Sequence, residues 1–321
     1  ELNYVDGVTS NIQTQLDAKS SVTGLDGLTD VKSAGTNFTG SLLIGHQTTG
    51  TLNAAEYNTG VGLTALDAIT TGDYNTAVGG ISLTANTTGD KNTAVGYGSQ
   101  ASNTSGRKNT AMGHNALEYG SSANQNVAIG MDALRGNSAS HYNTGIGMGA
   151  LTDANRTADT DGYNTALGYN AGNAGTNDLT TGNKNTFIGA STAASAAAGT
   201  NQTIIGYGAS GTANNSVTIG NSDVTAWYPG SDDTADLGSS SVEFKDLYID
   251  GTANLDAVDI DGGAIDGAPI GANSASTGAF TTVTASTSLD ITGSAGLILE
   301  NDETITNSSN GTVLVLSLIH I

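Results

Sequence analysis

Residues 74–96 read YNTAVGGISLTANTTGDKNTAVG, so the phrase xNTAVG occurs twice in this stretch, 17 residues apart. Related six-residue phrases occur eleven times along the chain. Their closing glycines are Gly45, Gly62, Gly79, Gly96, Gly113, Gly130, Gly147, Gly168, Gly189, Gly206 and Gly220. Successive glycines are separated by 17 residues six times, and then by 21, 21, 17 and 14. A repeat of this length indicates a stacked array of structural units.

Each phrase alternates in the manner of a β-strand. Its fifth letter is a large aliphatic residue in every copy, such as Val78, and its third letter is mostly Thr, such as Thr76. This alternation predicts a strand with one buried face, and we assign the aliphatic side chains to that face. The fourth letter is mostly Ala or Gly, such as Ala77, which predicts a smooth opposite face that another subunit could approach closely. The closing glycine is expected to end the strand at a corner with positive φ.

A second apolar residue follows four positions after many of the closing glycines. It is leucine at Leu66, Leu83, Leu117, Leu134 and Leu151, and turn-prone letters such as TTGD follow it. One repeat therefore predicts a strand, a corner, a short strand and a turn. Seventeen residues are too few for a propeller blade, and no repeat shows a sustained helical stripe. The predicted fold class is all-β, a parallel β-solenoid or β-roll of about eleven short coils.

The segments on either side of the repeat differ from it. Val5, Val8, Ile12 and Leu16 recur at helical spacing, which predicts a short N-terminal helix that a bundle of chains would stabilise. The predicted divisions are 1–20 (helix), 21–40 (linker), 41–220 (solenoid shaft), 221–250 (small β module) and 251–321 (β-rich, irregular continuation). The module is expected to hold its own apolar cluster of Trp227, Leu237, Phe244, Leu247, Tyr248 and Ile249. Residues 316–321, LSLIHI, resemble the translated read-through of a sequencing adapter and are expected not to belong to the protein.

Asparagine is the second letter of eight phrases. These residues are Asn58, Asn75, Asn92, Asn109, Asn126, Asn143, Asn164 and Asn185. Stacked coils would place their amides above one another, which predicts a hydrogen-bonded ladder along the axis. The alternative is a turn residue that bonds its own backbone.

The first letter of the phrase varies, and this column is the candidate binding surface. Its candidate binding residues are Tyr57, Tyr74, Lys91, Lys108, Tyr142 and Tyr163, and Gln125 lies among them. A row of such side chains could bind a glycan or another part of a host-cell surface. The alternative is a column of solvated long side chains without a ligand.

Composition disfavours several functional classes. The net charge of −21 and the pI near 4.1 argue against nucleic acid and anionic membranes as partners. The chain has no cysteine, which excludes disulfides and thiolate metal sites. It has no run of about 20 apolar residues, so insertion into a membrane as a helix is not expected. It begins at Glu1 rather than Met, and we expect further residues to precede it.

Carboxylates are the only candidates for chemistry, and we expect no enzymatic activity, cofactor or bound metal. Asp73 and Asp90 share one repeat position, and Asp159 and Asp161 lie in a longer loop. A pair of carboxylates about 5–10 Å apart could hydrolyse a glycosidic bond. The alternative is a set of solvated acidic turn residues. Acidic clusters at 232–236 and 256–266 could bind Ca²⁺, but neither carries a recognised calcium-binding motif.

The energetics of a single coil favour an oligomer. One coil buries only two or three aliphatic side chains, too few to compensate for the conformational entropy of ordering its 17 backbone residues. Burial of the small Ala and Gly face against sister chains would offset much of this deficit.

The repeat NTAVGxxAL resembles the head repeats of trimeric autotransporter adhesins, over about residues 41–220. That resemblance implies a left-handed parallel β-roll built from three chains. The coils here are longer than the coils of those adhesins, and only the step from Gly206 to Gly220 falls to 14 residues.

The flanking segments resemble bacteriophage tail-fibre and related virion proteins. The similar segments are ELNYVDGVTSNIQTQLDAK (1–19), DLGSSSVEFKDLYIDG (236–251) and IDGGAIDGAPIGANSASTGAFTTVTAS (260–286). This resemblance implies a homotrimeric, non-catalytic fibre shaft on a virion that contacts a glycan or protein of the host-cell surface. An adhesin on a bacterial cell surface is the alternative, and a polysaccharide-cleaving spike enzyme has less support.

Overall fold

The computed structural model describes residues 30–33, 35–46, 48–153, 161–174, 178–228, 230, 237–239 and 241–250. Contacts divide the chain into two units, Glu1–Ala235 and Asp236–Ile321. The predicted N-terminal helix, within 1–20, and the predicted continuation, 251–321, lie outside the described residues.

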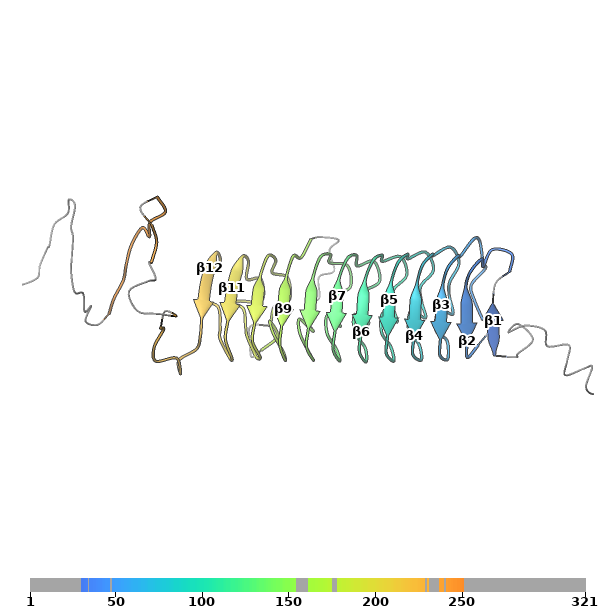
Figure 1. The fold of residues 1–321 in the computed structure, drawn as a ribbon, viewed down its shortest axis with the longest axis horizontal. Helices are drawn as coiled ribbons and strands as arrows, with labels where there is room; N and C mark the ends of the chain where they lie inside the picture. The colour runs from blue at the N-terminus through green and yellow to red at the C-terminus, as the bar shows by residue number, and fades with distance from the viewer. Residues whose placement is uncertain are drawn as a thin grey trace, which may run out of the picture. The chain divides into compact units, whose positions relative to one another are not determined.

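Twelve short strands follow one another in chain order within a single sheet (Figure 1). They are β1 (Val31–Ser33), β2 (Leu42–Ile44), β3 (Thr59–Val61), β4 (Thr76–Val78), β5 (Thr93–Val95), β6 (Thr110–Met112), β7 (Val127–Ile129), β8 (Thr144–Ile146), β9 (Thr165–Leu167), β10 (Thr186–Ile188), β11 (Gln202–Ile205) and β12 (Ser216–Ile219). All pairings from β2 to β12 are parallel. The chain is a parallel β-solenoid of about ten turns. The predicted fold class is confirmed.

Equivalent letters of the repeat lie directly over one another. In the pairing of β4 with β5, Thr76 lies opposite Thr93 and Val78 lies opposite Val95. The same register holds where the repeat lengthens, because β8 still pairs with β9 through like positions. Additional residues in the longer coils are therefore accommodated outside the strands.

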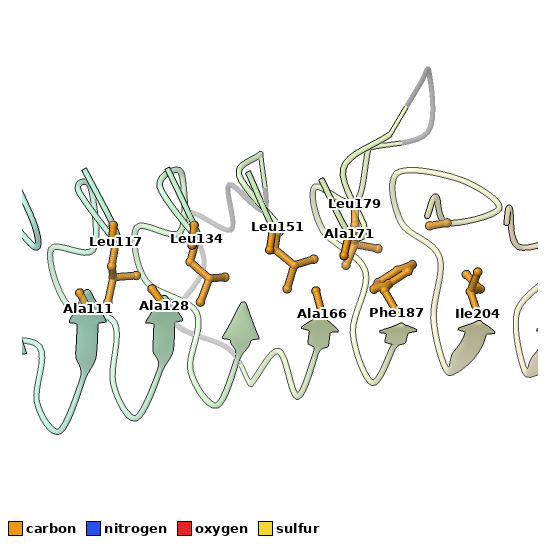
Figure 2. Packing of buried hydrophobic residues seen from close by; sticks show 14 of the residues in the cluster. Ala111, Leu117, Ala128, Leu134, Leu151, Ala166, Ala171, Leu179, Phe187 and Ile204 are labelled. Carbon is orange, nitrogen blue, oxygen red and sulfur yellow. The ribbon is translucent and has the colours of Figure 1, made fainter. Parts of the chain in front are cut away.

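The alanines at the strand centres, rather than the large aliphatic residues, face the interior of the solenoid. Ala77 is fully buried, whereas Val78 beside it is 37% exposed. The predicted assignment of the two strand faces is therefore wrong. The physical reason is the narrow interior, which the leucines of the opposite wall already fill (Figure 2). A Cβ added at Gly145, for example, would lie only 3.1 Å from Leu134 Cγ.

The leucine column lies on turns and not on a second strand. Leu66, Leu83 and Leu117 are buried and have φ values of 60°, 49° and 51°. Within the described coils, no named strand follows the corner, so the predicted short second strand is wrong. The left-handed conformation lets the backbone change direction at the leucine while the leucine side chain points into the interior.

After Leu151 the large and small side chains change places, so that the strand centre carries the large side chain and the leucine position carries the small residue. Gly172 occupies the leucine position of its coil, and Phe187 occupies the strand centre of the next coil. Both residues are buried. A Cβ added at Gly172 would lie 2.9 Å from Phe187 Cδ2, so the phenyl ring fills the space that a leucine would take (Figure 2). Close packing thus constrains the combined volume of the two facing side chains rather than the size of either one alone.

Two separate features require glycine at the end of the phrase, and Gly79 shows both. Gly79 has φ of 136°, a conformation that side-chain-bearing residues rarely adopt. A Cβ added there would also lie 2.5 Å from the carbonyl oxygen of Gly96 in the next coil. The expected corner with positive φ is confirmed, and the close approach of successive backbones is a further constraint.

One end of the solenoid is closed by a strand that runs in the opposite direction. β1 pairs antiparallel with β2, and the Gly45 N–H donates to the Asp30 carbonyl at 2.7 Å. Val31 and Phe38 are buried in this region. Since β1 occupies the outer edge of β2, that edge has no vacant backbone position for another parallel coil.

The six side chains of the predicted apolar cluster of 221–250 are not buried by the described residues. These side chains, Trp227, Leu237, Phe244, Leu247, Tyr248 and Ile249, are 51–91% exposed. Within 237–239 and 241–250, the only pairing is an isolated bridge between Ser239 and Val242. Trp227 belongs to the first unit and the other five residues belong to the second, and the cluster stays a prediction.

Candidate functional site

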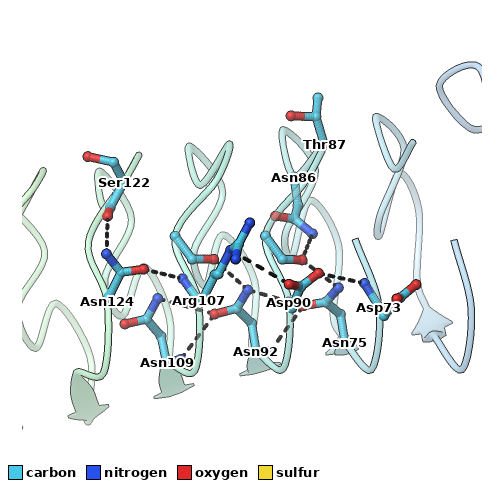
Figure 3. A network of polar contacts seen from close by, with 12 residues as sticks. Asp73, Asn75, Asn86, Thr87, Asp90, Asn92, Arg107, Asn109, Ser122 and Asn124 are labelled. Carbon is cyan, nitrogen blue, oxygen red and sulfur yellow. Dashed lines mark hydrogen bonds and ion pairs between the residues drawn. The ribbon is translucent and has the colours of Figure 1, made fainter. Parts of the chain in front are cut away.

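The buried asparagines form the ladder that the sequence predicts. Asn92 Oδ1 accepts hydrogen bonds from the Asn109 backbone N–H at 3.0 Å and from Asn109 Nδ2 at 3.1 Å. Asn109 Nδ2 also donates to the Ala123 carbonyl at 2.7 Å. Figure 3 shows Asn75, Asn92 and Asn109 in successive coils of the ladder. The same bonds to the preceding amide recur from Asn75 to Asn185. Each amide therefore joins neighbouring coils, and most of them also tie the strand to the turn that follows it. Asn143 is the exception, because its Nδ2 donates to Ser140 Oγ at 3.0 Å and to the His141 carbonyl at 3.1 Å in the preceding turn.

Other polar residues continue the ladder at its two ends. Ser41 precedes the first asparagine, and its Oγ accepts the Asn58 N–H at 2.8 Å. Gln202 follows the last one, and its N–H donates to Asn185 Oδ1 at 3.0 Å. Both positions are buried. The ladder thus tolerates a hydroxyl or a longer amide where one neighbour is absent.

A second set of buried asparagines was missed by the sequence analysis. Asn86, Asn103 and Asn137 each donate to the backbone oxygen three residues later, and Asn103 Nδ2 also donates to Asn86 Oδ1 at 2.8 Å. They recur at multiples of the 17-residue period, which was the available signal. The signal was hidden because these residues lie among turn-prone letters. Gly120 interrupts this set, and Asn103 Oδ1 is buried without a hydrogen-bond partner.

The residue before each phrase contributes a polar column at the edge of the coils. Asp73 Oδ1 accepts the Glu56 N–H at 2.7 Å, and Asp90 Oδ1 accepts the Asp73 N–H at 3.0 Å. Arg107 follows in the column, and its Nε lies 3.6 Å from Asp90 Oδ2 (Figure 3). Asp73 and Asp90 therefore hold backbone amides of neighbouring coils, which is a structural use of both carboxylates.

The candidate binding surface lies on the turn that precedes each strand. Tyr57, Tyr74, Lys91, Lys108, Tyr142 and Tyr163 all have φ between 50° and 58°, and the four tyrosines are 40–55% exposed. Their backbones are held by the neighbouring coil, as where the Tyr74 N–H donates to the Glu56 carbonyl at 3.0 Å. Such hydrogen bonds compensate for the left-handed conformation. The structure thus brings these residues together in one exposed column, and their role in binding stays a prediction.

The tyrosine rings of this column stack on one another. The rings of Tyr57 and Tyr74 are 5.0 Å apart with an interplanar angle of 11°, and those of Tyr142 and Tyr163 are 5.0 Å apart with an angle of 7°. A Cβ added at Gly40 would lie 2.8 Å from Tyr57 Cδ1, so backbone also lies against the Tyr57 ring. Ring faces are largely taken up by these contacts, which leaves edges and hydroxyl groups for a ligand.

One tyrosine hydroxyl of the column is paired with a predicted catalytic candidate. Tyr163 Oη donates to Asp161 Oδ2 at 2.9 Å, and this hydrogen bond raises the pKa of Tyr163. The other member of that predicted pair, Asp159, lies outside the described residues, so their separation is not defined. The acidic residues at 232–236 and 256–266 lie outside them as well.

An apolar surface runs along the outside of the coils. We call it the outer stripe, and it comprises two columns. The first holds the fifth letters, which were expected in the interior, namely Ile44, Val61, Val78, Val95, Met112, Ile129, Ile146, Leu167, Ile188, Ile205 and Ile219. The second holds the residues that follow the closing glycines from Gly45 to Gly206, namely His46, Leu63, Gly80, Tyr97, His114, Met131, Met148, Tyr169, Ala190 and Tyr207. Of these side chains, His46 is only 8% exposed. Neither column contains Asp, Glu, Lys or Arg, and exposure reaches 69% at Leu63 and 74% at Tyr207.

No three His, Asp or Glu side chains in the described part of the chain are grouped closely enough to hold a metal ion. No helix with the length and apolarity of a membrane span occurs among the same residues.

Comparison with known proteins provides no relative. No family, no curated protein and no solved structure matches the chain. Arguments about function therefore rest on the repeat, the ladders, the exposed column and the outer stripe.

Proposed function

We propose that this chain is the structural, host-contacting shaft of a homotrimeric bacteriophage tail fibre and that it has no catalytic role. The outer stripe carries the proposal. It extends from β2 to β12 without an ionic side chain, in a chain whose net charge is −21. A continuous exposed apolar surface of this kind is typical of a protein–protein interface.

The partner that fits this stripe best is another copy of the same chain. Successive coils are spaced by about 4.8 Å, the separation of neighbouring strands. Parallel copies share that period, so each row of one stripe meets an equivalent row along the whole solenoid. Closed cyclic symmetry is the usual way in which identical chains cover such a surface. Three is the number that the resemblance of the repeat and of its flanks to trimeric proteins favours.

The exposed side chains beyond β12 support the same partner. Phe244, Leu247 and Tyr248 are at least 64% exposed in one chain. Apolar residues grouped so closely in sequence gain from burial between copies, because none of the described residues covers them. A fibre in which the copies run together beyond the solenoid would cover them.

Sedimentation equilibrium of the whole chain tests the assembly. The expected mass is about three times the 31.9 kDa of one chain. Val78→Asp places a charge in the outer stripe and is expected to shift the equilibrium toward monomer. Ser105→Asp places the same charge on an exposed turn outside the stripe and is expected to remain trimeric. The proposal is contradicted if the unaltered chain is a stable folded monomer.

Methionine oxidation provides an independent test of the same surface. Met112, Met131 and Met148 are the only methionines in the chain, all lie in the outer stripe, and they are 42–45% exposed in one chain. Peroxide should therefore oxidise them slowly in the assembly and several-fold faster in the Val78→Asp variant. Mass spectrometry of the peptides measures both rates. Equal rates in the two proteins would place the interface elsewhere.

The alternative is a surface adhesin of a bacterium, which the resemblance of the repeat to adhesin heads favours. Both functions use the same solenoid and the same trimer, so biophysical measurements on the chain do not separate them. Immunogold electron microscopy with an antibody against 41–220 does. Label on virion fibres supports the tail-fibre proposal, and label on uninfected cells supports the adhesin.

A further inference from the structure

Three cationic residues lie together on neighbouring coils of this acidic chain. Lys91 and Lys108 occupy the same position of successive repeats, and the Lys108 N–H donates to the Asp90 carbonyl at 2.9 Å. Arg107 directly precedes Lys108, and all three side chains are exposed. The chain has nine Lys and Arg residues against 30 Asp and Glu residues, so this grouping reverses the sign of charge locally.

The positive charge of this group is only partly neutralised. Arg107 Nε lies 3.6 Å from Asp90 Oδ2. Neither lysine ammonium pairs with a carboxylate within the described part of the chain. Lys91 Nζ lies 6.0 Å from the ring centroid of Tyr74, a contact that orients it without cancelling its charge. Like charges on neighbouring coils repel, and a bound anion relieves that repulsion.

The shape of the surface favours an extended ligand. Lys91 and Lys108 both project from turn residues with φ of 58°, so they repeat with the same geometry from coil to coil. Their backbones are separated by the strand spacing of about 4.8 Å. That step is close to the length of one sugar unit in an extended chain. A polymer with one anionic group per unit can therefore lie along the axis and meet one lysine per coil.

The neighbouring residues of the column suit sugar rather than nucleobase contacts. Tyr74 precedes the lysines and Gln125 follows them, and both are exposed. Nucleobases bind single-strand sites largely by stacking on free aromatic faces. The Tyr74 ring is stacked on Tyr57 and has Lys91 nearby, so its face is occupied. Phenol edges and an amide remain to form hydrogen bonds with sugar hydroxyl groups.

We propose that Lys91, Arg107 and Lys108 form a docking site for a linear acidic polysaccharide. This proposal rests on the host-contacting function and names the chemical class of the host ligand. Recognition is by charge at a repeated spacing, with hydrogen bonds from Tyr74 and Gln125 beside it. Carboxylated and sulfated polymers share this chemistry.

Fluorescence anisotropy of the whole chain with labelled polymers at 0.15 M salt tests the site. The probes are polygalacturonate (carboxylate), dextran sulfate (sulfate), neutral dextran and a single-stranded DNA oligonucleotide. The unaltered chain is expected to bind at least one acidic polysaccharide and not neutral dextran. K91Q/K108Q is expected to weaken binding tenfold or more and to reduce the slope of log affinity against log salt by about two.

Two control variants separate charge from structure. K184Q removes an isolated lysine from the same column and is expected to change affinity less than twofold. K91R/K108R keeps both charges and is expected to keep binding. Unfolding midpoints of all variants should match that of the unaltered chain. The proposal is overturned if no acidic polysaccharide binds, if K91Q/K108Q binds as well as the unaltered chain, or if the DNA binds more tightly than both acidic polysaccharides.

The failure of this proposal is distinguishable from failure of the proposed function. Sedimentation of the same samples reports the trimer, which K91Q/K108Q leaves intact because these residues lie outside the outer stripe. If the chain is a trimer but binds no acidic polysaccharide, only the docking-site proposal is refuted. If the chain is a monomer that does bind one, the fibre-shaft proposal is refuted and the docking site stands.

Discussion

Replacing Asn109 by Ala removes one amide from the middle of the asparagine ladder. Four side-chain hydrogen bonds are lost, to Asn92 Oδ1, to the Ala123 carbonyl, and from the backbone and side chain of Asn126, at 2.7–3.3 Å. Two of the groups left behind keep another bond. Asn92 Oδ1 still accepts the Asn109 backbone N–H, and Asn126 Nδ2 still donates to the Ser140 carbonyl.

The free-energy cost comes from the two groups that lose their ladder partner. These groups are the Ala123 carbonyl and the Asn126 backbone N–H. A buried polar group without a hydrogen bond costs about 1–3 kcal/mol, so Asn109→Ala should destabilise each chain by about 2–6 kcal/mol. A loss of this size is a large share of the stability of a typical domain, about 5–15 kcal/mol.

Urea unfolding followed by circular dichroism at one fixed protein concentration measures this cost. Asn214→Ala is the matched control, because Asn214 Oδ1 accepts the Thr200 N–H at 2.8 Å in an exposed pair. The control should cost about 1 kcal/mol or less. Asn109→Ser should be intermediate, since Ser41 already serves as the first ladder residue. Equal shifts for Asn109→Ala and Asn214→Ala would refute the reasoning.

Three further changes have expected outcomes. Gln100→Leu should raise the free energy of unfolding by up to about 1 kcal/mol in urea titrations, because Gln100 Oε1 is buried without a partner in a column of leucines and this gain exceeds the loss of the 3.2 Å hydrogen bond from Nε2 to the Thr93 carbonyl. Gly113→Ala should lower it by at least about 2 kcal/mol in the same assay, since φ is 140° and the new Cβ would lie 2.5 Å from the Gly130 carbonyl oxygen. Burial raises the pKa of Asp178, and the nearby Asp153 raises it further. The folded state therefore disfavours ionised Asp178, so its penalty is absent below the ordinary carboxyl pKa, grows as the pH rises from there to the raised pKa, and is complete above it. Asp178→Asn should accordingly raise the melting temperature at pH 7 and leave it nearly unchanged at pH 3, and an equal gain at both pH values would contradict this assignment.

The period and the ladder were predictable because both depend on identity between repeats. Val78 stacks on Val95 because equivalent residues occupy equivalent positions in every coil. Asn75 and Asn92 bond because a polar letter that recurs in a stacked array meets itself. Neither inference requires knowledge of the path of the chain between the strands.

The two faces of the strand were assigned wrongly because alternation does not say which face is inside. Ala77 points inward because the facing wall already delivers leucines such as Leu83 to a narrow interior. That wall is formed by turns with left-handed residues, and the periodic leucines do not reveal this backbone conformation. Phe187 opposite Gly172 shows that the choice depends on both walls together.

The candidate binding column was visible as a variable position, but its contacts were not. Stacking of Tyr57 on Tyr74 depends on the left-handed turn that aligns the two rings. The ion pair of Arg107 with Asp90 depends on which residues the turn places on neighbouring coils. Sequence alone suggested a set of exposed side chains, and the turn geometry converts it into a charged segment flanked by stacked rings.

The closed edge at β1 and the nearest-neighbour contacts of the coils bear on how such a protein changes during evolution. Each described strand contacts only the strand before it and the strand after it. A gene can therefore gain or lose the codons of one whole coil without creating an unmatched junction. Unequal recombination within the repeat would lengthen or shorten the rod in steps, while the cap at its beginning stays the same.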